Sequence, residues 1–99
     1  MHSKLVSDKI PEIIRSKGEI PNIRVADDQE YWQKLKEKLQ EEVDEFFKDS
    51  NEEELIDILE VINAISEFKK FDKEKLELLR KNKAEEKGTF KERIILDEV

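Results

Sequence analysis

The sequence predicts an all-α fold, a four-helix-bundle-like arrangement followed by an extended C-terminal tail. Three observations lead there. The 99 residues include only two Gly and two Pro, which leaves little material for turns. Charged residues make up 45% of the chain, and the abundant Glu, Lys and Leu favour helices over strands. Apolar residues recur every three or four positions. The length indicates a single domain over residues 1–99.

The first expected helix lies within SDKIPEIIRSKG, residues 7–18. Ser7 or Asp8 is expected to cap it, Pro11 suits its first turn, and Gly18 is expected to end it. The following residues, 19–26, contain Pro21 and several β-branched side chains. We therefore expect them to form an extended connection.

Three longer helices are expected over residues 27–50, 50–71 and 72–88. The caps would be Asp27 or Asp28, then Asn51, which forms a capping-box pattern with Glu54, and then Asp72. Gly88 should stop the last helix, and residues 89–99 should form the tail. The apolar stripe of the long helix consists of Trp32, Leu35, Leu39, Val43 and Phe46.

Composition excludes several classes of function. The net charge is −7 and no Lys/Arg block is free of acidic neighbours, which argues against a nucleic-acid partner. Without cysteine, disulfides, zinc–thiolate sites and thiol nucleophiles are excluded, and the only histidine is His2. The apolar stretches are shorter than the ~20 residues that span a bilayer, and the N-terminus has no apolar signal core. We expect a cytoplasmic protein with no membrane partner.

Carboxylates interrupt the apolar faces of two helices. On a helical wheel, Glu54 and Asp57 fall inside the apolar arc of the third helix, whereas Glu42 lies at the edge of the stripe of the second and shares a face with Glu45. The short connection near residues 50 and 51 should make these helices antiparallel neighbours. The four carboxylates are then expected to converge near the junction.

A group of four partly buried carboxylates needs a compensating charge. Burial of an unpaired carboxylate is costly, and neighbouring negative charges raise that cost. The third helix has no Lys or Arg before Lys69, so lysine partners are not expected. Oxygen-only ligation suits Mg²⁺ or Mn²⁺, and we expect a metal site formed by Glu42, Glu45, Glu54 and Asp57. The alternative, solvated surface acids, better describes Glu41, Asp44, Glu52 and Glu53.

The acid pattern E-E-x-x-E (Glu41, Glu42, Glu45) followed by E-x-x-D (Glu54, Asp57) resembles the signature of MazG-like all-α nucleoside triphosphate pyrophosphohydrolases, which are related to phosphoribosyl-ATP pyrophosphohydrolase. KLVSDKIPEII, residues 4–14, and KAEEKGTFKERIIL, residues 83–96, resemble the two ends of a small house-cleaning subgroup. Two positions depart from that subgroup. Ser7 stands where an arginine is usual, and Thr89 replaces a second glycine.

The resemblance implies Mg²⁺-dependent cleavage between the α- and β-phosphates of a nucleoside triphosphate, giving a monophosphate and pyrophosphate. It implies the same four metal ligands, and Glu45 is expected to orient the attacking water. The candidate phosphate contacts are Lys4, Lys9, Lys83, Lys87 and Arg93. The alternatives are a phosphoribosyl-ATP hydrolase and a non-catalytic acidic interaction module.

The third helix is apolar over more than half of its circumference. Three other helices of a 99-residue chain would not cover such a surface, so we expect a homo-oligomer. The resemblance points the same way, to a homodimer or a dimer of dimers.

Overall fold

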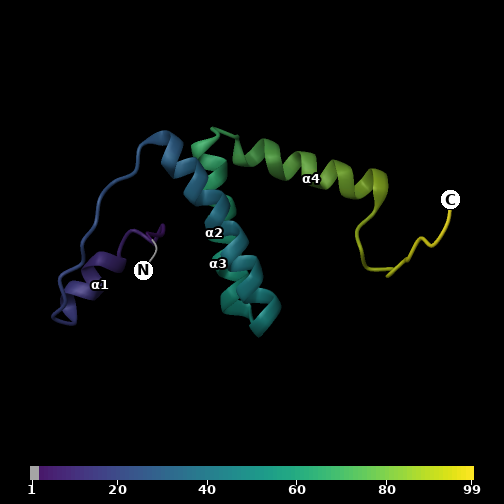
Figure 1. Cartoon of the computed structure of the whole chain (residues 1–99). Coiled ribbons are helices and arrows are strands. Elements are labelled where there is room, and N and C mark those ends of the chain that lie inside the picture. Colours follow the sequence, from purple (N-terminus) through teal and green to yellow (C-terminus); the bar gives the residue numbers. More distant parts are fainter. Residues whose placement is uncertain (1–2) are drawn as a thin grey trace.

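The structure, a computed structural model, describes residues 3–99; His2 lies outside them. The described chain contains four helices and no strand: α1 (Ile10–Ser16), α2 (Asp28–Asp49), α3 (Glu52–Phe68) and α4 (Lys73–Lys87) (Figure 1). The prediction of an all-α fold with a non-helical C-terminal tail is confirmed. None of these four helices has the length and apolar character needed to cross a membrane.

Side-chain caps start the three longer helices as predicted. Asp27 Oδ1 accepts a hydrogen bond from the Glu30 amide at 2.9 Å, and Asn51 Oδ1 accepts one from the Glu54 amide at 3.0 Å. Asp72 caps α4 in the same way. These bonds satisfy amide groups that would otherwise lack partners in the first turn.

The predicted cap of α1 is wrong. Lys9 is the N-cap residue, and its side chain accepts no capping bond. A turn precedes the helix, in which the Ile10 amide donates to the Ser7 carbonyl at 3.0 Å. A backbone carbonyl, instead of the Ser7 or Asp8 side chain, therefore accepts the hydrogen bond at the start of the helix. Gly18, just beyond the helix, has a φ of +85°, which suits glycine.

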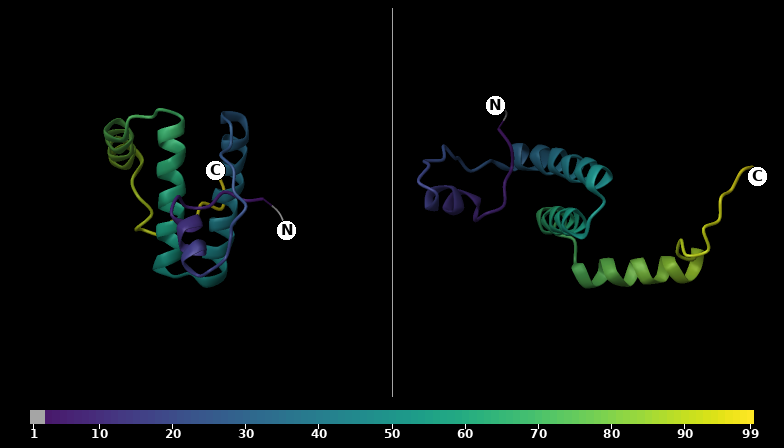
Figure 2. Two further views of the ribbon diagram at one scale, coloured as in Figure 1. Left: turned by 90° about the vertical axis from the view of Figure 1, so that its left-hand side faces the viewer. Right: turned by 90° about the horizontal axis from the view of Figure 1, so that it is seen from below.

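Helices α2 and α3 form an antiparallel pair, the hairpin (Figures 1 and 2). Ser50 makes the turn with a φ of 52°, and its amide donates to the Phe46 carbonyl at 2.7 Å. Leu35 of α2 and Val61 of α3 are buried between the helices. At the other end of the hairpin the Trp32 ring stacks on Phe68, with centroids 5.9 Å apart.

Helix α4 and the tail lie away from the hairpin, whereas the segment before α1 contacts α2, where the Ser3 carbonyl accepts a hydrogen bond from Lys34 Nζ at 3.0 Å. Figure 2 shows α4 leading outward from the end of α3, and α4 contains no buried residue. The radius of gyration is 17.8 Å, whereas a compact domain of this length has about 13 Å. One apolar side of α3 faces α2, but Leu55, Leu59 and Ile62 on the other side are exposed. The closely packed part of the bundle within one chain is the hairpin.

Candidate metal site at the turn of the hairpin

The turn between α2 and α3 brings the predicted acids together. Glu42 and Glu45 lie in the last two turns of α2, and Glu54 and Asp57 lie in the first two turns of α3. Because the helices are antiparallel and only Ser50 and Asn51 separate them, these four positions lie at the same end of the hairpin. The sequence placed them there from helix periodicity and loop length alone.

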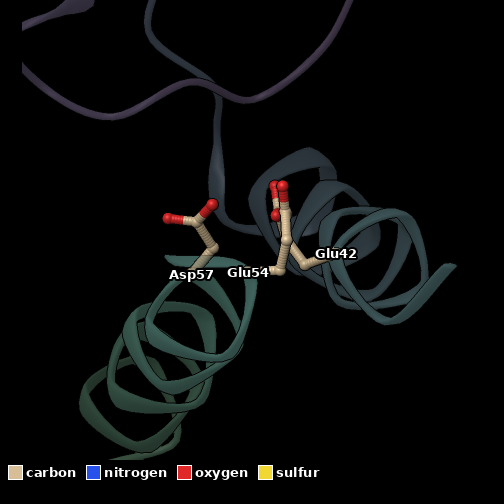
Figure 3. Close-up of side chains that lie close together, drawn as sticks. All are labelled: Glu42, Glu54 and Asp57. Carbon is tan, nitrogen blue, oxygen red and sulfur yellow. The ribbon is translucent and has the colours of Figure 1, made fainter. Parts of the chain in front are cut away.

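Three of the four carboxylates form one compact group. Glu42, Glu54 and Asp57 each offer an oxygen atom, and these atoms all lie within 4.8 Å of one another. Figure 3 shows the carboxylate of Glu54 beside that of Glu42, with Asp57 on the neighbouring turn of α3. Oxygen atoms at this spacing can converge on one divalent cation with small changes of rotamer.

Glu45 belongs to a second, overlapping group. Its carboxylate lies with those of Asp49 and Glu54, again with the ligand atoms within 4.8 Å. Glu54 is therefore the residue that both groups share. Asp49 was not among the predicted ligands, although it follows Glu45 by four residues and so shares its helix face. That spacing was the signal that could have identified it.

The other carboxylates of the two groups repel a negative charge on Glu54. Partial desolvation raises the pKa of the Glu54 carboxyl group, and the negative charges of Asp57, Asp49, Glu45 and Glu42 raise it further. The ionised form of Glu54 is thus disfavoured in the folded chain. Among residues 3–99, neither Glu54 nor Asp57 forms an ion pair. A bound cation would supply the missing positive charge.

Glu42 does have a lysine partner, contrary to the expectation from sequence. The Lys38 Nζ lies 3.2 Å from the Glu42 carboxylate and 3.6 Å from that of Glu41. Glu42 is buried, with 8% of its surface exposed, so this contact compensates a largely desolvated charge. The absence of Lys and Arg from most of the third helix did not exclude this partner, because Lys38 lies on α2 itself, four residues before Glu42.

The expectation that the four carboxylates are partly buried holds for only some of them. Glu42 is buried and Glu54 is half-buried, but Asp57 and its neighbour Ile56 are exposed. The reason is that no other part of the described chain covers this face of α3. The carboxylates on α3 therefore open toward solvent.

The predicted phosphate contacts are distributed unevenly. Lys4 lies beside α2, with its Nζ 3.8 Å from Glu41, and it lines a shallow depression together with Lys34 and Lys38. Lys9 is exposed in the turn before α1. The remaining three, Lys83, Lys87 and Arg93, lie on α4 and the tail, which begin at the opposite end of the hairpin and lead away from it (Figure 1). Within one chain the structure does not bring those three to the acids.

Comparison with known proteins gives one partial relative. A protein of Mycolicibacterium smegmatis, described as an uncharacterized protein, is 54% identical over 43 residues. The match covers 43% of this chain and 44% of the relative, so the chain spans less than half of that protein. No family model matches the chain, and no solved structure gives a significant match.

Proposed function

We propose that the protein is a Mg²⁺-dependent nucleoside triphosphate pyrophosphohydrolase that cleaves between the α- and β-phosphates. The observation that carries the proposal is the group formed by Glu42, Glu54 and Asp57, whose oxygen atoms lie within 4.8 Å of one another while Glu54 and Asp57 have no ion pair among the described residues. Mn²⁺ is expected to substitute for Mg²⁺ because it accepts the same oxygen ligands. The acid pattern and the two chain ends noted above support the same chemistry.

The carboxylates would have two tasks. Glu42, Glu54 and Asp57 would hold the cation, which would supply positive charge beside a polyanionic substrate and make water a better nucleophile. Glu45, exposed at the edge of the cluster, would orient the attacking water toward the α-phosphorus and accept its proton. The water oxygen forms the new bond to the α-phosphorus, and the bridging oxygen leaves with pyrophosphate.

Positive side chains beside the cluster would contact the phosphates. Lys38 lies next to the candidate ligands and Lys4 and Lys34 line the same depression. With Glu42 engaged in holding a cation, the Lys38 ammonium group would be available to contact a phosphate oxygen. Lys38 thus joins Lys4 as a candidate substrate contact, a role that the sequence had not indicated.

The activity is tested with canonical and damaged nucleoside triphosphates and with phosphoribosyl-ATP, each with Mg²⁺ in water enriched in ¹⁸O. The proposal expects monophosphate and pyrophosphate as products, with the label in the monophosphate because water attacks the α-phosphorus. Release of diphosphate and inorganic phosphate, or undiminished turnover in excess EDTA, would contradict it.

A matched pair of variants links that activity to the cluster. Glu54→Gln removes the carboxylate shared by both acid groups, and we expect kcat/KM to fall about 100-fold or more. Glu53→Gln is the control, because Glu53 is an exposed acid of the same helix turn that belongs to neither group. Equal losses in the two variants would assign the effect to net charge instead of the site.

A further inference from the structure

We propose that the depression lined by Lys4, Lys34 and Lys38 is the subsite for the leaving pyrophosphate, and that Lys34 makes the protein select nucleoside triphosphates over diphosphates. We call this surface the lysine depression. The proposal rests on the proposed function and adds to it the direction in which a triphosphate lies on the hairpin.

The charge on one face of α2 changes sign along the helix. That face contains two lysines in the N-terminal half and three acids in the half nearer the turn, in the order Lys34, Lys38, Glu42, Glu45 and Asp49. The phosphates beyond the cleaved bond carry most of the substrate's charge. Glu45 and Asp49 would repel them and the two lysines would attract them. The β- and γ-phosphates are therefore expected to extend from the acids toward the N-terminus of α2.

The contacts of the lysines give the order in which these phosphates would meet them. Lys38 is nearest to the acids, with its Nζ 3.2 Å from the Glu42 carboxylate. Lys4 is farther away and contacts Glu41, the second partner of Lys38, at 3.8 Å. Lys34 lies one helical turn beyond Lys38, about 6 Å along the axis. Lys38 is thus placed for the β-phosphate, and Lys34 with Lys4 for the γ-phosphate.

The lysines of α2 are held more firmly than the acids beside them. The side chains of Lys34 and Lys38 are only 24% and 20% exposed, whereas those of Glu37 and Glu41, which also line the depression, are 52% and 40% exposed. Lys34 Nζ also donates to the Ser3 carbonyl at 3.0 Å. The two glutamates can turn toward solvent when an anion arrives, while the ammonium groups lose little freedom on binding it.

The most acidic helix takes no part in this surface. The lining comes from α2 and residues 3–5 and includes no residue of α3, which contains six carboxylates and no Lys or Arg. Three lysines face two glutamates in the depression. It is therefore a place beside the acid cluster where positive groups outnumber negative ones, as a pyrophosphate subsite requires.

This arrangement makes the number of phosphates a criterion of selection. A nucleoside diphosphate would place only its β-phosphate on the lysine depression, at Lys38. A triphosphate would add its γ-phosphate at Lys34, and one charge-assisted contact of this kind changes affinity about 10-fold or more.

The test is a ¹H–¹⁵N chemical-shift titration of the whole chain with inorganic pyrophosphate and with inorganic phosphate, each in Mg²⁺. Pyrophosphate should shift the amide signals of residues 3–5 and 34–38, and Lys34→Met should weaken its binding about 10-fold. Inorganic phosphate should bind the wild type and Lys34→Met equally, because it reaches only Lys38.

Two further variants separate the contact from net charge and from folding. Lys36→Met removes the same charge from an exposed lysine of α2 whose Nζ lies over the Trp32 ring, and it should bind pyrophosphate as the wild type does. Lys34→Arg keeps the charge and should restore most of the affinity. Circular dichroism melting of Lys34→Met checks that the helices remain.

Kinetics supply the second measurement. Lys34→Met should raise KM about 10-fold for a nucleoside triphosphate and leave KM unchanged for the corresponding diphosphate. Equal affinity of wild type and Lys34→Met for pyrophosphate, or an unchanged KM for the triphosphate, would overturn the subsite while the hydrolysis stands. Equal weakening of phosphate and pyrophosphate would also overturn it, since Lys34 would then act only by holding Ser3. Pyrophosphate binding as expected without any hydrolysis of triphosphates would reject the proposed function and support the subsite.

Discussion

Helices α3 and α4 are neighbours in the chain and are both rich in charge, yet they use it differently. In α4 the charges are mixed, and one pair, Arg80 with Glu77, closes at 2.7 Å on the surface. In α3 every charge is negative, and three of its acids lie in the first turn. Glu54 and Asp57 join Glu42 of α2 in a group with atoms within 4.8 Å of one another.

The comparison shows that the number of charged residues in a helix does not distinguish a solvated surface from a candidate cation site. The balance between positive and negative charges does distinguish them. Mixed charges along a helix such as α4 are compatible with a solvated surface, and each exposed pair contributes little to stability. Unbalanced acids that converge on a partly desolvated point, as around Glu54, raise the free energy of the folded chain. A cluster with this cost is expected where a cation is bound.

The packed hairpin and the exposed helix α4 should respond differently to loss of an apolar side chain. Leu35 is 1% exposed between α2 and α3, so Leu35→Ala should lower the free energy of unfolding by about 2–5 kcal/mol. Leu78→Ala on α4 is the control, because Leu78 is 58% exposed and lies away from the face of Leu76 and Leu79. Urea denaturation measures both. A comparable loss in Leu78→Ala would show that this side of α4 is packed.

The lysine beside the cluster should stabilise the protein when no metal is present. Lys38 is the ion-pair partner of buried Glu42 at 3.2 Å. Lys38→Met should therefore lower the free energy of unfolding in EDTA by about 1–3 kcal/mol, because a desolvated carboxylate loses its partner. Lys36→Met, an exposed lysine of the same helix, serves as the control. No difference between the two variants would mean that Glu42 does not need Lys38.

A smaller effect is expected from pH. The pKa of Glu54 is raised above its ordinary value of 4.5 in the folded chain, so the folded state holds this proton more tightly than the unfolded state. In EDTA, the stability contributed by that proton is present below pH 4.5 and is lost as the pH rises through the raised pKa. Subtracting the unfolding curve of Glu54→Gln from that of wild type isolates this loss. A difference that stays constant between pH 4 and 7 would contradict the raised pKa.

The helix starts and the convergence of the acids could be predicted from residues that are close in the sequence. Asp27, Asn51 and Asp72 each cap a helix where the sequence placed them, because a capping bond involves only residues two or three positions apart. The convergence of Glu42, Glu54 and Asp57 followed from helix periodicity and a two-residue connection. The same periodicity could have predicted that Lys38 contacts Glu42 and that Asp49 lies beside Glu45, since each lies four residues from a predicted ligand.

The position of α4 relative to the hairpin could not be predicted from the sequence. It depends on the Schellman motif that ends α3, in which the Phe71 amide donates to the Ser66 carbonyl at 2.9 Å and Lys70 has a φ of 59°. Glycine or asparagine is the usual sequence signal for that position, and Lys70 is neither. The same motif explains why Lys83, Lys87 and Arg93 lie away from the acids of their own chain. It also explains why Leu59 and Ile62 are exposed although the sequence indicates an apolar face.

The central claim, that the acids at the turn of the hairpin hold a divalent cation, is tested most directly by the thermal unfolding of wild type and Glu54→Gln in EDTA and in Mg²⁺. In EDTA the variant should melt at the same or a higher temperature, because it loses a charge that repels its neighbours. In Mg²⁺ the order should reverse, because wild type gains binding energy from the cation and the variant gains less. A variant that is clearly less stable than wild type in EDTA, with no further change on adding Mg²⁺, would contradict the claim and would give Glu54 a structural role instead.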